Sequence, residues 1–530
     1  MRTIPELLRR AAETRANHTF VEYSGRALTY YDFRQLSMYV AAGLLDEGIG
    51  HGDRVALFLP NGIEFLECWL ALAEIGAIAV PINTGLKGAE TAYILDHSQA
   101  KALIAGPGLP PELGTAEAPW SGRTLCVGDR EAHPLFAAAL SLSELEGVQP
   151  VDFFPEVEED DVATFVYTSG STGRPKAVMQ THRTYALSGE GFAHWVGIGP
   201  ADRVLAVLPL FHINAQAYST MGAMAAGATL LVAERFSASR FWELAASTRA
   251  THFNCVGAMM QILCKRLPSP AERGHSVRVA YCAPALPAET HRAAEERFGL
   301  RIVIGYGLSE CTYGTVTPLD LPPRPPSMGL ARRHPEGATV NEIRVVDSEG
   351  ADAPPGAPGE IWLRNAAVMK GYWRDPAATH AALAGGWLHT GDVAFRDSDG
   401  WLTFVDRRSD QIRRRGENIA SREVEECLAA HPAVLEAAVV GVPSELGEDE
   451  VKAFVVLRED ADVTAAELAR WCAARLAGFK VPRYVELRRE LPRTPTHRVA
   501  KAALQKEPVC PAGCWDEEAT TASSKPSWPA

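Results

Sequence analysis

The nine residues from Thr168 to Lys176, Thr-Ser-Gly-Ser-Thr-Gly-Arg-Pro-Lys, have the side chains and the flexibility to bind phosphate. Glycines let backbone N–H groups approach an anion, hydroxyl groups donate hydrogen bonds, and a lysine neutralises phosphate charge. The spacing differs from that of a P-loop, which needs Gly-x4-Gly-Lys followed by Ser or Thr. We predict that the segment holds the triphosphate of a nucleotide, with an ordinary Gly/Ser-rich surface turn as the alternative. The predicted phosphate-binding residues are Thr168, Ser169, Gly170, Ser171, Thr172, Gly173 and Lys176.

A second polar group follows the apolar run from Arg301 to Gly305. Tyr306 offers a flat face for an adenine ring, and Ser309 offers a hydroxyl group for a phosphate. Glu310 carries oxygen atoms suited to an Mg²⁺ ion that bridges phosphates. Taken singly, Tyr306 also fits a core position and Glu310 also fits the first turn of a helix. Their adjacency after one predicted strand favours a nucleotide site.

Five segments of the chain together resemble the superfamily of acyl-CoA synthetases, adenylation domains and luciferases. They stand in the order and spacing of that superfamily, and the resemblance spans about residues 5 to 505. It implies an ATP-dependent enzyme that joins a small acid to AMP, releases pyrophosphate, uses Mg²⁺ and passes the acyl group to CoA. Asp406–Ile419, Ala477–Arg483 and Phe211-His212 look most like the matching segments of bacterial crotonobetaine/carnitine-CoA ligases and of broader medium-chain or aryl acyl-CoA synthetases. The five segments are Tyr167–Lys176, Gly305–Glu310, Thr390–Asp392, Asp406–Arg407 with Gly416–Ile419, and Pro492–Lys501.

The resemblance also implies roles for single residues. Asp392 would accept the ribose hydroxyls, with a turn-forming aspartate as the alternative, and Arg407 would reach the ribose as well. Ala283 would stand in the loop that flanks the adenine. His212 would border the acid pocket and the path of the thiol, with a hydrogen-bonded core histidine as the alternative. The nucleotide would be held by Ala283, Tyr306, Gly307, Ser309, Asp392 and Arg407 together with the phosphate-binding residues, and Mg²⁺ by Glu310 and Thr168.

Lys501 is the residue to which the resemblance assigns the main catalytic role. When a carboxylate attacks the α-phosphate, two anions meet, and a cation between them stabilises the transition state. A lysine near the end of a chain is otherwise most often a solvated surface charge. The implied catalytic residues are Lys501, Glu310 and His212.

Departures from the pattern of the superfamily leave the acceptor of the acyl group open. Ser409 stands at the expected hinge, Arg415 precedes Gly416, and His497-Arg498 replaces the usual Gly-Lys before Lys501. The first hypothesis is transfer to CoA. The second is an amine, a carrier-protein thiol, or an arylamine that receives adenylated nitrite, as in diazotases; the third is a nucleotide-binding protein without catalysis. The acid is not defined, and the candidate pocket walls are residues 212–217, 254–259 and 305–314.

The elements that would position these residues alternate between short apolar strands and helical segments, which predicts the α/β class. We expect a large N-terminal domain of layered α/β sheets, with a β-rich subdomain from Asn341 to Trp401 where Gly and Asp turns recur. A small α+β domain, mobile if it follows the resemblance, would come next. The predicted boundaries are residues 1–407, 408–506 and a disordered tail at 507–530, which is rich in Pro, Ser, Thr and Ala.

Length and composition narrow the possible partners. A chain of 530 residues exceeds the size of one hydrophobic core, so at least two domains are expected. A net charge of -13 argues against nucleic acid as a partner, and no apolar stretch reaches the ~20 residues of a membrane span. The ten cysteines have no zinc-like spacing, and the first residues carry charges in place of a secretory signal. We therefore expect a cytoplasmic protein whose partner is a small-molecule acid, with a homodimer left open.

Overall fold

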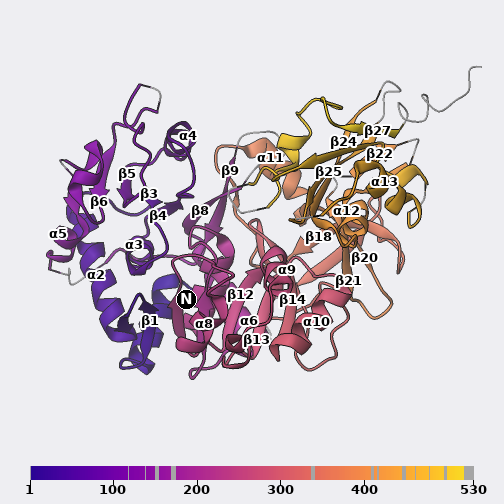
Figure 1. The fold of residues 1–530 in the computed structure, drawn as a ribbon. Coiled ribbons are helices and arrows are strands. Elements are labelled where there is room, and N and C mark those ends of the chain that lie inside the picture. Colours follow the sequence, from indigo (N-terminus) through magenta and orange to yellow (C-terminus); the bar gives the residue numbers. More distant parts are fainter. Residues whose placement is uncertain are drawn as a thin grey trace, which may run out of the picture. The chain divides into compact units, whose positions relative to one another are not determined.

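The chain forms two compact units, each of which is described separately below (Figure 1). The large unit comprises Met1–Arg344, Trp362–Thr390 and Arg396–Thr403, and the small unit comprises Val345–Ile361, Gly391–Phe395 and Phe404–Ala530. The domain boundaries expected at residues 407 and 506 stay predictions. The computed structural model describes residues 2–116, 118–137, 139–149, 154–168, 175–335, 341–407, 411–414, 417–444, 449–459, 461–476, 478–494 and 498–517.

The first sheet of the large unit has eight strands in the order β19-β9-β8-β4-β3-β5-β6-β7. Strands β8, β4, β3, β5, β6 and β7 run parallel, whereas β9 is antiparallel to both of its neighbours. Strands β4 and β5 are buried along their whole length, which explains why they read as continuous apolar runs in the sequence. The bounds are β3 Arg54–Phe58, β4 Ile78–Pro81, β5 Ala102–Ala105, β6 Arg123–Cys126, β7 Leu140–Ser141, β8 Val162–Thr168, β9 Lys176–Thr181 and β19 Gly371–Tyr372.

The second sheet of the large unit has nine strands in the order β16-β15-β14-β13-β12-β10-β11-β1-β2. From β14 to β1 the strands are parallel, so their carboxyl ends lie along one edge of the sheet, where ligands bind in open α/β folds. The bounds are β1 Thr19–Tyr23, β2 Arg26–Thr29, β10 Arg203–Ala206, β11 Thr229–Val232, β12 His252–Val256, β13 Val279–Ala283, β14 Arg301–Leu308, β15 Cys311–Val316 and β16 Leu330–Ala331. Together the two sheets confirm the predicted α/β class.

Helices connect the parallel strands of both sheets. Helix α10 between β13 and β14 buries only His291, Ala294 and Phe298, which are three and four residues apart and form one apolar face. Helix α2 begins where the Thr29 hydroxyl accepts a 3.1 Å hydrogen bond from the backbone of Asp32. The bounds are α1 Ile4–Thr14, α2 Tyr30–Asp46, α3 Ile63–Glu74, α4 Gly88–Ser98, α5 Leu142–Glu146, α6 His182–Val196, α7 Met221–Ala226, α8 Phe241–Ser247, α9 Gly257–Lys265, α10 Ala288–Phe298 and α11 Pro376–Ala382.

The β-rich section predicted from Asn341 to Trp401 is confirmed as a four-stranded sheet in the order β17-β18-β20-β21. In the small unit, a hairpin of β22 and β23 precedes a sheet in the order β24-β25-β26-β27. Buried Val424, Leu428 and Leu468 of its helices pack with buried strand residues into one core. The bounds are β17 Glu342–Val346, β18 Pro358–Arg364, β20 Leu388–Arg396, β21 Leu402–Arg407, β22 Gln411–Arg414, β23 Glu417–Ala420, β24 Val434–Pro443, β25 Asp449–Leu457, β26 Tyr484–Arg488, β27 Trp515–Asp516, α12 Ser421–Ala429, α13 Ala465–Ala473 and α14 Lys501–Leu504.

The expectation of a disordered tail is wrong for residues 507–517. Strand β27 extends the sheet of the small unit by pairing antiparallel with β26, Trp515 opposite Val485. The ammonium group of the buried Lys452 donates a 2.9 Å hydrogen bond to the backbone oxygen of Pro508. A segment poor in apolar residues can still be ordered when its backbone forms hydrogen bonds with an open strand edge and with a buried cation. Residues 518–530 lie outside the described part of the chain.

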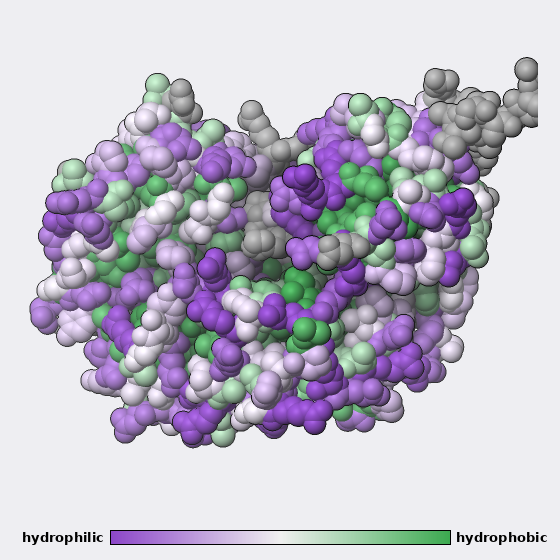
Figure 2. Space-filling model, viewed as in Figure 1, coloured by the Kyte–Doolittle hydropathy of each residue, from purple (hydrophilic) through white to green (hydrophobic). Residues whose placement is uncertain are grey.

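The surface is mostly hydrophilic on the face shown in Figure 2, with apolar side chains in small patches. Exposed large apolar side chains among the described residues include Ile262 and Leu267, which are 46% and 89% exposed. In the described part of the chain, every helix is too short or too polar to cross a lipid bilayer.

We expect Glu67→Gln to stabilise the protein at alkaline pH. Burial in α3, and then the neighbouring Glu146, raise the pKa of Glu67 from 4.5 to about 9. Because the folded protein holds this proton more tightly than the unfolded chain, stability falls as pH rises from 4.5 towards 9. The glutamine variant lacks this loss of stability, so its free energy of unfolding should exceed that of wild type by about 5 kcal/mol at pH 8 and by little at pH 5.

Thermal unfolding of both proteins at the two pH values measures the difference. The matched control is Glu243→Gln in helix α8, because the Glu243 side chain is exposed and lies on another helix. It should leave the pH dependence of stability unchanged. If the stability of Glu67→Gln depends on pH as that of wild type does, then Glu67 is not the group whose ionisation lowers stability at alkaline pH.

Candidate functional site

The predicted phosphate-binding segment connects the two antiparallel strands β8 and β9. Thr168, the last residue of β8, is paired with Lys176, the first residue of β9. The hydroxyl and ammonium groups predicted to contact phosphate therefore start from directly opposite backbone positions. Ser169, Gly170, Ser171, Thr172 and Gly173 lie outside the described residues. The sequence predicted a strand before this segment but not the strand that begins at Lys176.

Two residues that the sequence did not single out surround Lys176. Its Nζ atom lies 3.5 Å from Asp375 Oδ2 and 5.1 Å from the centre of the Tyr372 ring. The other carboxylate oxygen of Asp375 accepts a 2.9 Å hydrogen bond from Ala378 N and so caps α11. The lysine is held by a carboxylate and an aromatic face, both of which a phosphate could displace or share.

Tyr372 joins Lys176 to Glu310. Its hydroxyl group donates a 2.9 Å hydrogen bond to Glu310 Oε1, while its ring lies beneath the ammonium group of Lys176. Burial, and then Glu310, raise the pKa of Tyr372 above its ordinary value, so the hydroxyl stays a donor at neutral pH. A cation and a carboxylate that stand 134 positions apart in the sequence are thus brought to one aromatic side chain.

Glu310 lies in the tight connection between β14 and β15, and the other residues predicted beside it lie on the same hairpin. The Glu310 backbone oxygen accepts a 2.7 Å hydrogen bond from Met369 N, and the Ser309 backbone oxygen accepts one from Gln180 Nε2 of β9. Strand β9 therefore holds both Lys176 and the turn that carries Glu310.

Tyr306 and Gly307 lie at the carboxyl end of β14. Tyr306 is buried, with 7% of its surface exposed. A Cβ atom at Gly307 would lie 2.7 Å from the Tyr218 hydroxyl oxygen, so this position accepts only glycine. Ala283 ends β13, which pairs in parallel with β14, and so it lies at the same edge of the sheet. The structure brings these three predicted residues together.

His212 lies in the turn before the helical segment Asn214–Thr220, and its ring packs against that of Phe211 at 4.5 Å. Its backbone oxygen accepts a 3.2 Å hydrogen bond from Gln216 N, which starts that segment. Buried Asn254, in the middle of β12, donates hydrogen bonds of 3.1 and 3.0 Å to Asn214 Oδ1 and Ser219 Oγ. Two of the predicted pocket walls are therefore joined by a side-chain hydrogen bond, that between Asn254 and Asn214.

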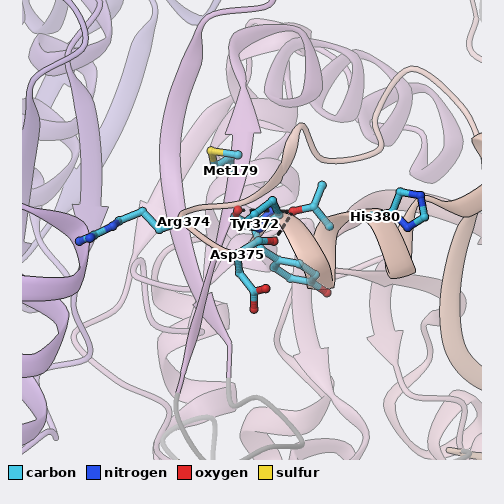
Figure 3. A pocket seen from close by; sticks show the side chains of 7 residues that line it. Met179, Tyr372, Arg374, Asp375 and His380 are labelled. Atoms are coloured by element: carbon cyan, nitrogen blue, oxygen red, sulfur yellow. Dashed lines mark hydrogen bonds between the residues drawn. The ribbon is translucent and has the colours of Figure 1, made fainter.

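A cavity of about 480 Å³ borders the residues that hold Lys176 (Figure 3). Tyr372 and Asp375 lie at its centre, while Arg374 points to one side and His380 lies on the other, along α11. None of the lining residues belongs to the predicted acid-pocket walls. They are Met179, Tyr372, Arg374, Asp375, Pro376, Thr379 and His380.

The remaining predicted residues belong to the small unit. Lys501 Nζ lies 2.8 Å from Glu425 Oε1 and donates a 2.6 Å hydrogen bond to Ser421 Oγ. The Ser421 hydroxyl in turn donates a 3.0 Å hydrogen bond to Asp406. Burial raises the pKa of Glu425, and Lys501 opposes that rise, so the pair stabilises a carboxylate in an apolar setting. Asp392 in β20 is buried, and Arg407 is the last residue of β21, with a side chain outside the described part.

Comparisons with known proteins agree with this arrangement. The family model of AMP-binding enzymes matches residues 8–373, and that of the AMP-binding enzyme C-terminal domain matches residues 423–498. A crotonobetaine/carnitine–CoA ligase of Escherichia fergusonii is 36% identical over 498 residues, which cover 91% of this chain and 95% of the relative.

Two solved structures are similar over nearly the whole chain. An anthranilate CoA ligase in complex with anthranoyl-AMP is 26% identical with a TM-score of 0.86, covering 99% of this chain and 98% of that one. The o-succinylbenzoate coenzyme A synthetase from Bacillus subtilis, in complex with ATP and a magnesium ion, is 27% identical with a TM-score of 0.80, covering 94% and 99%.

Proposed function

The chain belongs to the AMP-binding family of AMP-forming CoA ligases, and from that premise we propose that it activates a small carboxylic acid as an acyl-adenylate and transfers the acyl group to CoA. The observation that carries the proposal is the link from Lys176 through Tyr372 to Glu310. It supplies a phosphate-binding cation and a metal-binding carboxylate on two neighbouring hairpins.

The residues of the large unit fit MgATP. Lys176, Thr168 and the phosphate-binding segment would bind the triphosphate, and Glu310 would bind Mg²⁺. When bound, the metal ion would neutralise charge on the phosphate oxygens. Tyr306, Gly307, Ser309 and Ala283 would border the adenosine and the α-phosphate. In the small unit, Asp392 and Arg407 would bind the ribose.

The reaction would proceed in two displacements. A carboxylate oxygen of the acid attacks the α-phosphorus, the bond to pyrophosphate breaks, and pyrophosphate leaves with the bonding electrons. Lys501 would hold the attacking oxygen against a phosphate of the same charge. The CoA sulfur then attacks the acyl carbon, and AMP leaves as the weaker base, with His212 beside the path of the thiol. The thiol proton is lost to solvent.

The class of acid is left at a small carboxylate. The similar proteins are named for crotonobetaine or carnitine, anthranilate and o-succinylbenzoate, which differ in charge and in aromatic character. At 36% identity or less, none of these names transfers to this chain.

The test is pyrophosphate release from MgATP with a panel of acids, measured with and without CoA. The proposal predicts release that depends on one or a few carboxylic acids, and an acyl-CoA product when CoA is present. Turnover that does not change with CoA but increases with an amine, a carrier protein or an arylamine with nitrite would support the second hypothesis, an acceptor other than CoA. Absence of release with every acid, despite measured ATP binding, would favour the nucleotide-binding protein.

We expect Tyr372→Phe to raise the Mg²⁺ concentration needed for half-maximal pyrophosphate release by about 3- to 10-fold. The variant removes the hydroxyl group that donates to Glu310 but keeps the ring beneath Lys176. The KM for ATP at saturating Mg²⁺ should change little. Tyr372→Leu, which also removes the ring, should in addition raise that KM. An unchanged Mg²⁺ dependence in Tyr372→Phe would contradict the role of the hydroxyl.

A further inference from the structure

We propose that helix α4, Gly88–Ser98, positions the phosphate-binding residues through Tyr93 and His97, which act as positioning residues on the strand ends that carry Thr168 and Lys176. The inference rests on the proposed function, because it assigns support to the ATP site of that function. It concerns residues that neither the motifs nor the family resemblance singled out.

Tyr93 and His97 each bind one side of the connection between β8 and β9. The Tyr93 hydroxyl donates a 3.1 Å hydrogen bond to the backbone oxygen of Pro175, directly before Lys176. His97 Nδ1 lies 2.8 Å from the hydroxyl of Tyr167, directly before Thr168. The two residues are four positions apart on the helix, and their rings stack at 5.4 Å. One helical face therefore contacts both strand ends.

The contacts leave the functional side chains free to face a ligand. Successive side chains of a strand point to opposite faces, so Tyr167 and Thr168 point to opposite sides of the sheet. Tyr167 and its partner Ala177 pack into the apolar core on the side of α4. Thr168 and Lys176, which are also paired, face the other way. The helix thus holds the backbone at the two positions without occupying the site.

The same helix supports the segment that carries Tyr372. The Trp373 indole N–H donates a 3.1 Å hydrogen bond to the backbone oxygen of His97, and Trp373 N donates a 2.9 Å bond to Ala177 O. Tyr372, the preceding residue, joins Lys176 to Glu310. His97 therefore contacts Tyr167 through its ring and the Tyr372 segment through its backbone.

Helix α4 is itself held at both ends. At its start, Glu112 Oε1 accepts a 2.8 Å hydrogen bond from Gly88 N. At its end, Arg54 of β3 donates hydrogen bonds of 3.2 and 2.9 Å to the backbone oxygens of Ser98 and Gln99. Burial, and then the nearby Arg374, lower the pKa of His97, so its ring is neutral at pH 7.5 and keeps one donor and one acceptor. A support anchored in this way resists displacement of the strand ends.

Hydrogen-bond deletion tests the proposal. Tyr93→Phe and His97→Leu should each weaken MgATP binding about 3- to 10-fold, because small misplacements of a binding group reduce its contribution. The KM for ATP should rise by the same factor, while the KM for the acid stays unchanged. His97→Asn, whose side chain places an amide group near the position of Nδ1, should restore most of the affinity. Binding is measured by isothermal titration calorimetry with MgATP and no acid.

The matched control is Tyr30→Phe, in α2. Its hydroxyl, like that of Tyr93, donates a hydrogen bond to a backbone oxygen; the acceptor, at 2.7 Å, belongs to Ala228, which is not part of the hairpin. Tyr30→Phe should lower the melting temperature and leave the Kd for MgATP unchanged. If the Tyr93 and His97 variants bind MgATP like wild type, or no more weakly than Tyr30→Phe does, the positioning role of α4 is overturned and the proposed function still stands. Failure of wild type to bind MgATP would overturn the proposed function as well.

Discussion

Lys501→Ala should lower acid-dependent pyrophosphate release by about 100-fold or more, while thioester formation from supplied acyl-adenylate and CoA stays near the wild-type rate. Only the first displacement brings two anions together, so only that step needs a cation between them. In the second displacement a thiol attacks an already activated acyl carbon. The two half-reactions are measured separately, the first as pyrophosphate and the second as AMP released from synthetic acyl-adenylate.

The surroundings of Lys501 suggest the control. In the small unit its ammonium group is paired with Glu425 and Ser421, so the alanine variant also removes a Lys–Glu contact from a half-buried site. Lys480, paired at 2.7 Å with Glu423 of the same helix, offers a matched contact without an assigned role in adenylation. Lys480→Ala should lose less stability, because its partner Glu423 is more exposed than Glu425, and should keep pyrophosphate release. Equal loss of both half-reactions in Lys501→Ala would refute the division of labour.

Much of the fold could be read from the sequence because the buried strands are short continuous apolar runs. The apolar run Arg54 to Leu59 forms β3 Arg54–Phe58, and the run His252 to Val256 forms β12 with the same bounds. Parallel strands buried on both faces need apolar side chains at every position, so local composition alone reveals them. The buried residues of α10 have the three- and four-residue spacing that marks a helix with one apolar face.

The strand β9 and the residues around Lys176 were harder to predict. β9 has three apolar residues, Ala177 to Met179, between polar ends, so it shows no period-2 pattern. Its pairing with β19 depends on residues almost 200 positions away. β19 has two residues, too few for a period-2 pattern. Tyr372 therefore carried no local signal. Asp375 did, since Asp followed by Pro marks the start of a helix, but this signal names a cap and not a partner for lysine.

The ordered segment at residues 507–517 has the same explanation. Pro, Ser and Thr predicted disorder from composition, whereas strand β27 is stabilised by the open edge of β26 and by the core residues that Trp515 contacts. Such stabilisation comes from residues that are distant in the sequence, so the composition of a short segment does not reveal it. The candidate catalytic residues, by contrast, could be listed because five segments of the chain have the order and spacing of a known superfamily. Their roles stay predictions until they are measured.

Glu310→Gln should lower the rate of pyrophosphate release by about 100-fold and abolish its saturation at millimolar Mg²⁺. Glutamine has the size of glutamate and keeps an oxygen that accepts the hydrogen bond of the Tyr372 hydroxyl. The substitution removes the negative charge and one of the two oxygens, and a charged oxygen binds a hard divalent cation more strongly than an amide oxygen does. The measurement is a titration of activity with Mg²⁺ and Mn²⁺ at fixed ATP.

Comparison with Tyr372→Phe separates charge from position. Tyr372→Phe keeps the carboxylate and loses the hydrogen bond, whereas Glu310→Gln keeps the hydrogen bond and loses the charge. If Glu310 binds the metal ion, the glutamine variant must be impaired at least tenfold more than the phenylalanine variant, because a charge contributes more than one neutral hydrogen bond. Equal impairment would mean that Glu310 acts by holding Tyr372 beneath Lys176, and the metal ligand would then have to be sought elsewhere on the two hairpins.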